Sequence, residues 1–216
     1  MTEIEEQTEF TFDELDESAK DKARDKVRYD NVNDEWWDFV YEDAVRMGAL
    51  IGINISKTDH HRKGRKSHQS IDISFSGFCS QGDGASFEGD YWFVPDALLK
   101  VQAETSDEEL LRIAQELLLL QLGRRMRGLE PFSATITTSG RYSHSGTMSV
   151  TVEADDDQDV VKMNDEGLED DVTQLMRDFA DWIYKNLEAE HDYLTSDECI
   201  DQYLAEEKFD SLGQVI

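Results

Sequence analysis

The chain has 216 residues, enough for one substantial domain, and its 49 Asp and Glu against 21 Lys and Arg give a formal net charge of −28. Because so negative a surface repels phosphate arrays, we expect direct binding neither to nucleic acid nor to an anionic membrane. Hydrophobic residues make up only 38% of the chain, but four Trp, ten Phe and seven Tyr supply bulk for a core, which argues against a disordered acidic chain.

The chain begins Met1-Thr2-Glu3, without the basic and apolar regions of a signal peptide, and no apolar run approaches the roughly 18 residues that a membrane span needs. We therefore expect a cytoplasmic protein. Its two cysteines, Cys79 and Cys199, lack the spacing of a metal site and are expected to be free thiols.

Two helices are predicted before residue 50. Residues 13–30 form the first, with Asp13 as N-cap and a thin apolar stripe that recurs every four residues: Leu15, Ala19, Ala23 and Val27. The second follows residues 31–34, and its apolar residues cover most of its circumference: Trp36, Trp37, Phe39, Val40, Ala44 and Met47. We expect the second helix to end between Gly48 and Gly52 and to lie in the core.

Period-two alternation then predicts strands. It runs through Ile51, Ile53 and Ile55, and again through Ile71, Ile73 and Phe75. The only basic cluster of the chain lies between them, in residues 57–69, and is expected to be an exposed, mobile hairpin loop. The glycine-rich residues 76–90 and the alternation Phe87, Tyr91, Phe93 predict a strand, a turn and a strand.

The remaining elements alternate in type. Pro95-Asp96 opens a short helix, and a capping box at residues 105–109 begins a long apolar helix that ends near Gly123 or Gly128. Residues 133–139 and 147–153 form a hairpin. A helix then starts near Asp165, and a last one runs from Thr195 to about Lys208.

Together these elements predict an α+β fold with a mainly antiparallel sheet of about five strands, packed by helices, and acidic helices at both chain ends. We expect residues 1–152 to form the α+β core domain with its N-terminal helices. Residues 153–216 are expected to be an acidic helical part packed on the same domain. The oligomeric state stays open, a dimer included.

The glycine-rich segment contains the first candidate site, the loop Gln81, Gly82, Asp83 and Gly84. Its glycines permit close approach of a ligand to the backbone, and Asp83 has the chemistry to accept hydrogen bonds or a metal. The loop lacks the lysine and the spacing of a phosphate-binding loop, and an ordinary hairpin turn accounts for it equally well.

No motif predicts catalysis. The neighbouring His60 and His61 lack an HExxH pattern, and neither GxSxG nor a cysteine beside a histidine is present. Carboxylates are so numerous that pairs of them identify no general acid. We therefore expect a protein that is not an enzyme, with no metal site and no cofactor.

The distribution of charge is the second candidate feature. Residues 1–45 hold 16 Asp and Glu against five Lys and Arg, residues 153–216 hold 21 against four, and the 107 residues between them hold 12 of each. Acids three or four positions apart on a helix are spaced much like the phosphates of a nucleic-acid strand. The residues predicted to bind a basic partner are Asp155, Asp156, Asp157, Asp159, Glu169, Asp170, Asp171, Asp178, Asp181 and Glu188.

Simple solvation or adaptation to high salt would also account for the acidic ends. A run of charge often forms only a solvated face. Adaptation to high salt predicts acid along the whole chain, and the balanced middle weakens that hypothesis.

A sequence resemblance bears on the choice between binding to a basic partner and a merely solvated surface. Residues 12–55, followed by IDISFSGFCSQGDGASFEG, resemble a family of uncharacterised phage and prophage proteins, sometimes labelled antitoxin-like, through the string FSGFxSQGDGAxF. The resemblance covers about the first 90 residues and implies a phage setting, hence the host cytoplasm, but no reaction. The charge is also similar to that of acidic phage proteins that imitate DNA and block restriction or CRISPR enzymes.

The sequence therefore favours a non-enzymatic inhibitor whose acidic surfaces occupy the nucleic-acid-binding groove of a basic host protein, either a defence protein or a DNA-processing protein. One alternative is a small-ligand or metal-dependent module centred on Gln81, Asp83 and the predicted helix over residues 35–43. An antitoxin-like interaction protein is the second alternative.

Overall fold

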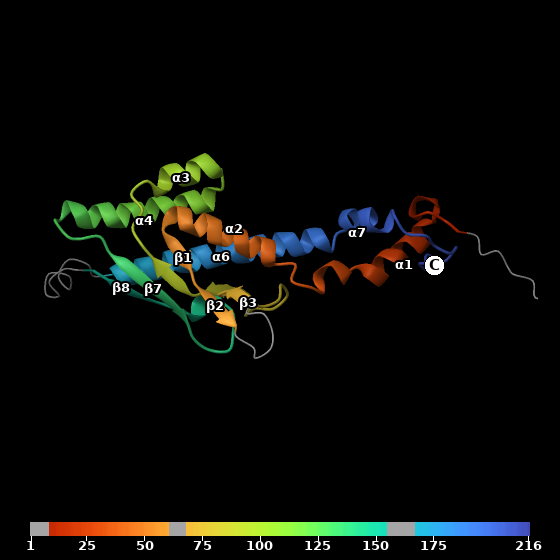
Figure 1. Ribbon diagram of the computed structural model, residues 1–216, viewed down its shortest axis with the longest axis horizontal. Helices are drawn as coiled ribbons and strands as arrows, with labels where there is room; N and C mark the ends of the chain where they lie inside the picture. Colours follow the sequence, from red (N-terminus) through yellow and green to blue (C-terminus); the bar gives the residue numbers. More distant parts are fainter. Residues whose placement is uncertain (1–8, 61–67, 155–166) are drawn as a thin grey trace, which may run out of the picture. The chain divides into compact units, whose positions relative to one another are not determined.

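The computed structural model describes residues 9–60, 68–154 and 167–216 (Figure 1). Helices and antiparallel sheet are both present, with helices at both chain ends, so the predicted α+β class is confirmed. The chain forms two compact units: residues 1–38 with 187–216, here called the acidic unit, and residues 39–186, here called the sheet unit.

This division differs from the predicted one at residue 152. Helix α6 (Leu168–Leu194) begins in the sheet unit, where Val172, Met176 and Phe179 are fully buried, and its last residues belong to the acidic unit. The two chain ends share one unit because the apolar stripe of the first helix is buried against C-terminal residues. Sequence composition carries no record of that pairing.

The acidic unit is built from short elements and the last residues of α6. They are η1 (Phe12–Glu14), α1 (Glu17–Val27), η2 (Asp30–Val32) and α7 (Asp197–Leu204). Asp13, the predicted N-cap, lies in η1; the N-cap of α1 is Asp16, whose carboxylate accepts a 2.8 Å hydrogen bond from the Ala19 N–H. Ser196 caps α7 by accepting from the Cys199 N–H at 3.2 Å.

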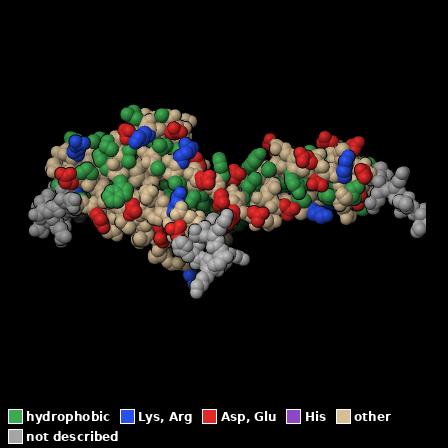
Figure 2. All heavy atoms as spheres, viewed as in Figure 1, with side chains coloured by type: hydrophobic (Ala, Val, Ile, Leu, Met, Phe, Trp, Pro, Cys, Tyr) green, Lys and Arg blue, Asp and Glu red, His purple; other side chains and the backbone are tan. Residues whose placement is uncertain are grey.

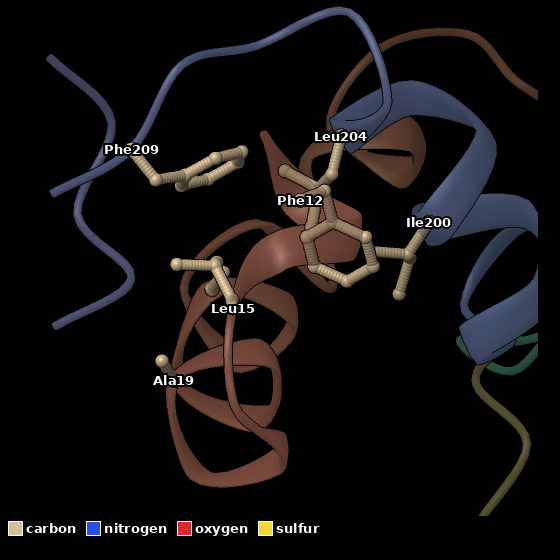
Figure 3. Packing of buried hydrophobic residues seen from close by; sticks show 7 residues of the cluster. Phe12, Leu15, Ala19, Ile200, Leu204 and Phe209 are labelled. Atoms are coloured by element: carbon tan, nitrogen blue, oxygen red, sulfur yellow. The ribbon is translucent and has the colours of Figure 1, made fainter. Parts of the chain in front are cut away.

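A small cluster of buried side chains forms the core of the acidic unit, and in Figure 3 they point toward one another from both ends of the chain. The cluster consists of Phe12, Leu15, Ala19, Ala23, Ile200, Leu204 and Phe209. The rings of Phe12 and Phe209 are 5.9 Å apart, and the backbones of Phe10 and Phe209 exchange two hydrogen bonds of 2.9 Å. The thin stripe predicted for the first helix is therefore buried against C-terminal residues.

The sheet unit contains the remaining elements. They are α2 (Asp38–Ile51, of which Asp38 belongs to the acidic unit), β1 (Ile53–Ile55), β2 (Lys57–His60), β3 (His68–Ile71), β4 (Ile73–Phe75), β5 (Ala85–Phe87), β6 (Gly89–Tyr91), α3 (Ala97–Glu104), α4 (Glu108–Met126), β7 (Ser133–Thr138), η3 (Ser145–Thr147), β8 (Met148–Glu153) and the first part of α6. Four antiparallel strands form the main sheet in the order β1-β6-β7-β8, and β2-β3 and β4-β5 form two small antiparallel pairs.

The main sheet buries one face and leaves the other to solvent. Along β7 and β8, Ala134, Ile136, Met148 and Val150 are buried, whereas the residues between them are exposed. Helices cover the buried face: the Gln121 amide of α4 lies 3.4 Å from the Tyr91 hydroxyl of β6. One solvated face is ordinary for an antiparallel sheet, and it explains the alternation that the sequence displays.

Helix α2 starts later than predicted and ends between Gly48 and Gly52, as predicted. Trp36 and Trp37 precede it, and Phe39 is 73% exposed, so the expectation of a helix buried on most sides is wrong for these residues. At the other end α2 continues through Gly48 to Ile51. Gly48 lies in tight packing, where a Cβ would meet the Ile53 carbonyl at 3.0 Å and the Phe179 ring at 3.2 Å.

The two isoleucine-rich strands each divide in two. The breaks occur at Ser56 and Asp72, where a closed ring of backbone hydrogen bonds joins three segments: Ser56 N–H to Glu88 O, Asp72 N–H to Ser56 O, and Glu88 N–H to Asp72 O, at 2.8 to 3.0 Å. The two parts of each predicted strand therefore have different partners: β1 pairs with β6, β2 pairs with β3, and β4 pairs with β5. The prediction of a loop over residues 57–69 is wrong at both of its ends, because residues 57–60 and 68–69 belong to β2 and β3, which pair as an antiparallel hairpin. Residues 61–67 of the predicted loop lie outside the described residues.

Candidate functional site

The acidic unit carries most of the negative charge of the protein. By sequence it holds 23 Asp and Glu against six Lys and Arg, a net charge of −17 in 68 residues. The sheet unit holds 26 against 15, a net charge of −11 in 148 residues. Figure 2 shows Asp and Glu side chains spread over the part that contains α1 and α7, with few Lys and Arg among them. Folding therefore brings residues 1–38 and 187–216 into one unit, whereas 12 of the 21 acids of residues 153–216 belong to the sheet unit.

Several basic side chains of the acidic unit are engaged by its own acids. Arg24 binds Asp201 through two hydrogen bonds of 2.7 and 2.8 Å and also lies 3.2 Å from Asp21. Its hydrogen bonds to the Asp201 carboxylate hold the pKa of Asp201 below its ordinary value. Arg28 pairs with Asp197 at 2.9 Å, and the hydrogen bond that it donates to Asp197 raises the pKa of Arg28. These pairs join α1 to the start and middle of α7.

A second group of acids lies where two segments of the acidic unit meet. The ring of Trp36 lies 5.7 Å from the ring of His191, which brings residues 34–38 beside the end of α6. The exposed carboxylates of these two segments, here called the acidic face, are Asp34, Glu35, Asp38, Glu188 and Asp192. Among the ion pairs found in the described ranges, only a 3.8 Å contact between Asp192 and His191 involves this face. The carboxylates of the acidic face are thus exposed to solvent on either side of the contact between Trp36 and His191.

A hollow of about 510 Å³ opens in the same unit. Its lining residues are Asn31, Leu194, Cys199, Gln202, Tyr203, Glu206 and Glu207. Asn31 donates to the Leu194 carbonyl at 3.4 Å and so joins the two sides of the hollow. Two carboxylates and a half-exposed tyrosine ring offer the chemistry that accepts a lysine or arginine side chain.

The acids predicted on α6 have different structural environments. Glu169, Asp170 and Asp171 occupy its first turn, where carboxylates stabilise the positive end of the helix dipole. Asp178 is half-buried and binds Arg112 at 2.5 Å and Gln174 at 2.7 Å, and Arg112 also binds Glu109 and Glu116. Asp178 therefore fastens α6 to α4 rather than facing a partner.

The spacing of the exposed acids on α6 is wide within the sheet unit. Asp170 and Asp181 are 11 residues apart, about 16 Å along the axis at 1.5 Å per residue. Phosphates of one DNA strand follow each other at roughly 3.4 Å along the duplex axis. Glu188 belongs to the acidic unit, and Asp155, Asp156, Asp157 and Asp159 lie outside the described residues. Of the predicted acids, Glu188 thus joins the newly identified acidic face.

In the loop that was the other candidate site, the Asp83 carboxylate accepts hydrogen bonds from the Cys79 and Ser80 N–H groups at 2.9 and 2.7 Å, which closes the turn. Gln81 and Gly82 are exposed, whereas Gly84 is buried against His144, so close that an added Cβ would lie 2.9 Å from the imidazole ring. These contacts explain Asp83 and Gly84 by the fold of the loop.

The flanking residues of the same motif are also used structurally. Ser76 donates to the Ser143 carbonyl at 3.1 Å and accepts from the Gly84 N–H at 3.3 Å. Phe78 packs between Phe75 and Tyr184, with ring centroids 5.8 and 5.4 Å away, and the Tyr184 hydroxyl donates to the Gly77 carbonyl at 2.9 Å. The FSGFxSQGDGAxF string therefore joins the loop to η3 and α6.

Two kinds of feature are absent from the described ranges. Over residues 9–60, 68–154 and 167–216, no group of three His, Cys, Asp or Glu is placed to hold a metal ion. In the same ranges no helix is both long and apolar enough to cross a membrane. Cys79 and Cys199 are free thiols, as predicted.

Comparison with known proteins identifies a family but no activity. No curated protein and no solved structure matches the chain. A family model described as a domain of unknown function, DUF8835, matches residues 36–197. The match includes the whole sheet unit and leaves α1 and nearly all of α7 outside it. Because the match covers more than half of its length, the chain belongs to the DUF8835 family.

Proposed function

We propose that the protein is a non-enzymatic, phage-type inhibitor whose acidic unit occupies the nucleic-acid-binding groove of a basic host protein, either a defence nuclease of the restriction or CRISPR class or a DNA-processing protein. One observation carries the proposal: the first 38 and the last 30 residues of the chain form a single unit with a net charge of −17. So much charge of one sign destabilises a small fold by self-repulsion, and binding to a basic groove offsets that repulsion.

The arrangement of the acids supports this role over that of a merely solvated surface. Arg24 and Arg28 are held in ion pairs inside the unit, so they leave the acidic face unneutralised. The hollow beside Tyr203 adds a place for one basic side chain of the partner. In this proposal the acidic face attracts the basic partner, and the hollow holds one of its side chains.

The family match is consistent with a division of labour. Helix α1 and nearly all of α7 lie outside residues 36–197, whereas the sheet unit lies entirely within the matched range. In this proposal the family domain supplies the sheet unit and three carboxylates of the acidic face, Asp38, Glu188 and Asp192. The chain ends add Asp34, Glu35 and the buried cluster of the acidic unit.

A competition assay tests the proposal. Purified restriction and CRISPR nucleases are loaded with a labelled DNA duplex, and release of the duplex is measured as the protein is added at several salt concentrations. Binding to the same groove releases the DNA, and because many charges contribute, the affinity falls steeply as salt rises. Affinity that does not change with salt would contradict the proposal.

Two variants with the same change of charge locate the interface. The triple reversal of Glu35, Asp38 and Asp192 to Lys alters the acidic face, and the triple reversal of Asp170, Asp171 and Asp181 to Lys alters exposed acids of the sheet unit. We expect the first variant to weaken binding at least tenfold and the second to weaken it two- to threefold through net charge alone. Equal loss in both variants would indicate attraction by net charge without a defined interface.

An antitoxin-like role makes a different prediction. It requires stable co-purification with the product of a neighbouring gene, without release of DNA from a nuclease. Neither Asp83 nor Gln81 enters either role, so Gln81→Ala serves as a neutral variant in both assays.

A further inference from the structure

Helix α4 carries apolar side chains on two separate sides. One side lies in the core of the sheet unit through Leu110, Ile113, Ala114 and Leu117. The other side, here called the α4 outer face, consists of Leu111, Gln115, Leu118, Leu119, Leu122 and Met126. An amphipathic helix that only covers a core has a polar outer side, so the second apolar side requires a separate reason.

The end of the outer face is open to solvent. Leu119 is 57% exposed, Leu122 is 40% exposed and Met126 is 88% exposed, and Leu99 on the adjoining α3 is 70% exposed. Figure 2 shows hydrophobic side chains at the surface over α3 and α4. Neighbouring exposed apolar side chains of this size are typical of interaction sites rather than of free surface.

The spacing of the outer face is that of a helix-pairing seam. Leu111, Gln115, Leu118 and Leu122 follow one another at steps of four, three and four residues, which keeps them on one line for a partner helix. Leu119 and Met126 widen the line on one side. The seam from Leu111 to Leu122 extends over about three of the helical turns of α4.

The charges at the ends of α4 identify the partner helix. Exposed Glu108 lies in the first turn, and exposed Arg125 and Arg127 lie in and just after the last turn. An antiparallel copy of the same helix brings the acidic start of each helix toward the basic end of the other. The outer face is thus complementary to itself in charge as well as in its apolar stripe.

We propose that the α4 outer face binds the α4 outer face of a second copy of this chain, antiparallel and about a two-fold axis, so that the protein is a homodimer. A second copy of this chain carries the same net charge of −28, and the opposite charges at the two ends of α4 offset part of that repulsion when the two helices are antiparallel. This inference does not depend on the proposed function.

Sedimentation velocity on the full chain, over a range of concentrations, tests the dimer. The wild type is expected at twice the chain mass of 24.8 kDa, and Leu122→Glu combined with Met126→Glu is expected at the mass of one chain. Leu212→Glu, which alters a similarly exposed leucine of the acidic unit, is the matched control and stays dimeric. Circular dichroism verifies that each variant is folded.

A charge exchange tests the antiparallel geometry without altering the apolar seam. Arg125→Glu is expected to weaken dimerisation about fivefold, and Glu108→Arg in the same chain restores it, because each dimer then has the two charges exchanged. Added salt screens the repulsion between two strongly negative chains, so the dimer persists at salt concentrations that abolish binding to a basic groove. A monomeric wild type, a dimer unaffected by the Leu122 and Met126 changes, or a failure of Glu108→Arg to restore Arg125→Glu would overturn the proposal.

Discussion

The acidic unit and the sheet unit of this protein are stabilised in different ways. The sheet unit has a large core, in which Phe179 stacks on Trp182 and meets Phe87 edge to face, and its net charge is small for its length. The acidic unit has a core of seven buried residues, and it carries the higher charge density. Ion pairs between α1 and α7 supplement that small core. The charge is thus concentrated where little apolar area opposes its repulsion, and the two units are expected to differ in stability.

The largest effect is expected from the core of the acidic unit. Phe209→Ala removes a fully buried ring packed on Phe12, at a cost of about 3–5 kcal/mol. Because the cluster is small, this loss should unfold the acidic unit while the sheet unit stays folded. Hydrogen exchange measured by mass spectrometry should show lost protection in α1 and α7 and retained protection in β6 and β7. Leu212→Ala, at an exposed site nearby, is the control. Simultaneous loss of protection in both units would show that they unfold as one.

The ion pair between Arg24 and Asp201 has the next largest expected effect. Arg24→Ala leaves a partly buried carboxylate without its partner and should destabilise the acidic unit by about 2–3 kcal/mol. Lys22→Ala, at an exposed position of the same helix, should change stability by less than about 0.5 kcal/mol. Chemical denaturation followed by circular dichroism measures the free energy of unfolding of both variants. Equal destabilisation by the two changes would show that the ion pair does not stabilise the acidic unit.

The same ion pair makes stability depend on pH. The folded pKa of Asp201 lies below its ordinary value of 3.8, so its contribution is present above about pH 4 and is lost as the pH falls through the folded pKa. Asp201→Asn should therefore be less stable than the wild type at pH 7, and the difference should shrink as the solution is acidified below pH 4. Acid also reduces the repulsion between carboxylates in both proteins. The difference in stability between the two proteins at each pH therefore isolates the contribution of Asp201. A difference that stays constant with pH would contradict this assignment.

Two acids on α6 lie in different environments within the sheet unit. Asp178 joins α6 to α4 through Arg112, so Asp178→Asn should cost about 1–2 kcal/mol. Asp181 is exposed, and Asp181→Asn should lie within about 0.5 kcal/mol of the wild type. Thermal unfolding distinguishes them, and Arg112→Ala should reduce the cost of Asp178→Asn in a double-mutant cycle.

The smallest effect is expected at Tyr91, whose hydroxyl lies near Gln121 in the core of the sheet unit. Burial raises the pKa of Tyr91 to about 12. Between about pH 10 and pH 12 the unfolded tyrosine is ionised while the folded one stays neutral, so the sheet unit loses stability as pH rises. An ultraviolet titration should show one of the seven tyrosines ionising last, and Tyr91→Phe should remove that component.

Local sequence signals predicted the helices and the last hairpin well. The Asp107 cap of α4, the apolar spacing of α6 and the alternation in β7 and β8 all arise from contacts within a few residues or from one buried face. The predictions were less accurate where distant backbone decided the outcome. Strands β1 and β4 leave their expected partners because a three-way backbone ring joins Ser56, Asp72 and Glu88. Trp36, Trp37 and Phe39 resemble core residues by composition but precede or flank the buried side of α2.

The candidate site shows the same limit. Sequence identified the acidic ends but placed the contact surface on α6, where Asp178 is engaged by Arg112 and the exposed acids are widely spaced. The acidic face was missed because Glu35 and Asp192 are more than 150 residues apart in the chain. The loop at Asp83 was recognised as distinctive, but only its hydrogen bonds to Cys79 and Ser80 explain why Asp stands there.

Sequence by itself determined the class of fold, the extent of most helices and the excess of acid at both chain ends, because each depends on composition or on short-range periodicity. Tertiary structure alone decided that those ends share one small core, that some acids are neutralised within it, and that α4 retains a second apolar side. Each of these depends on which side chains become neighbours when Phe12 meets Phe209 and α4 packs on the sheet. Pairing over long sequence distances is selected by the packing of the whole chain, and no local pattern specifies it.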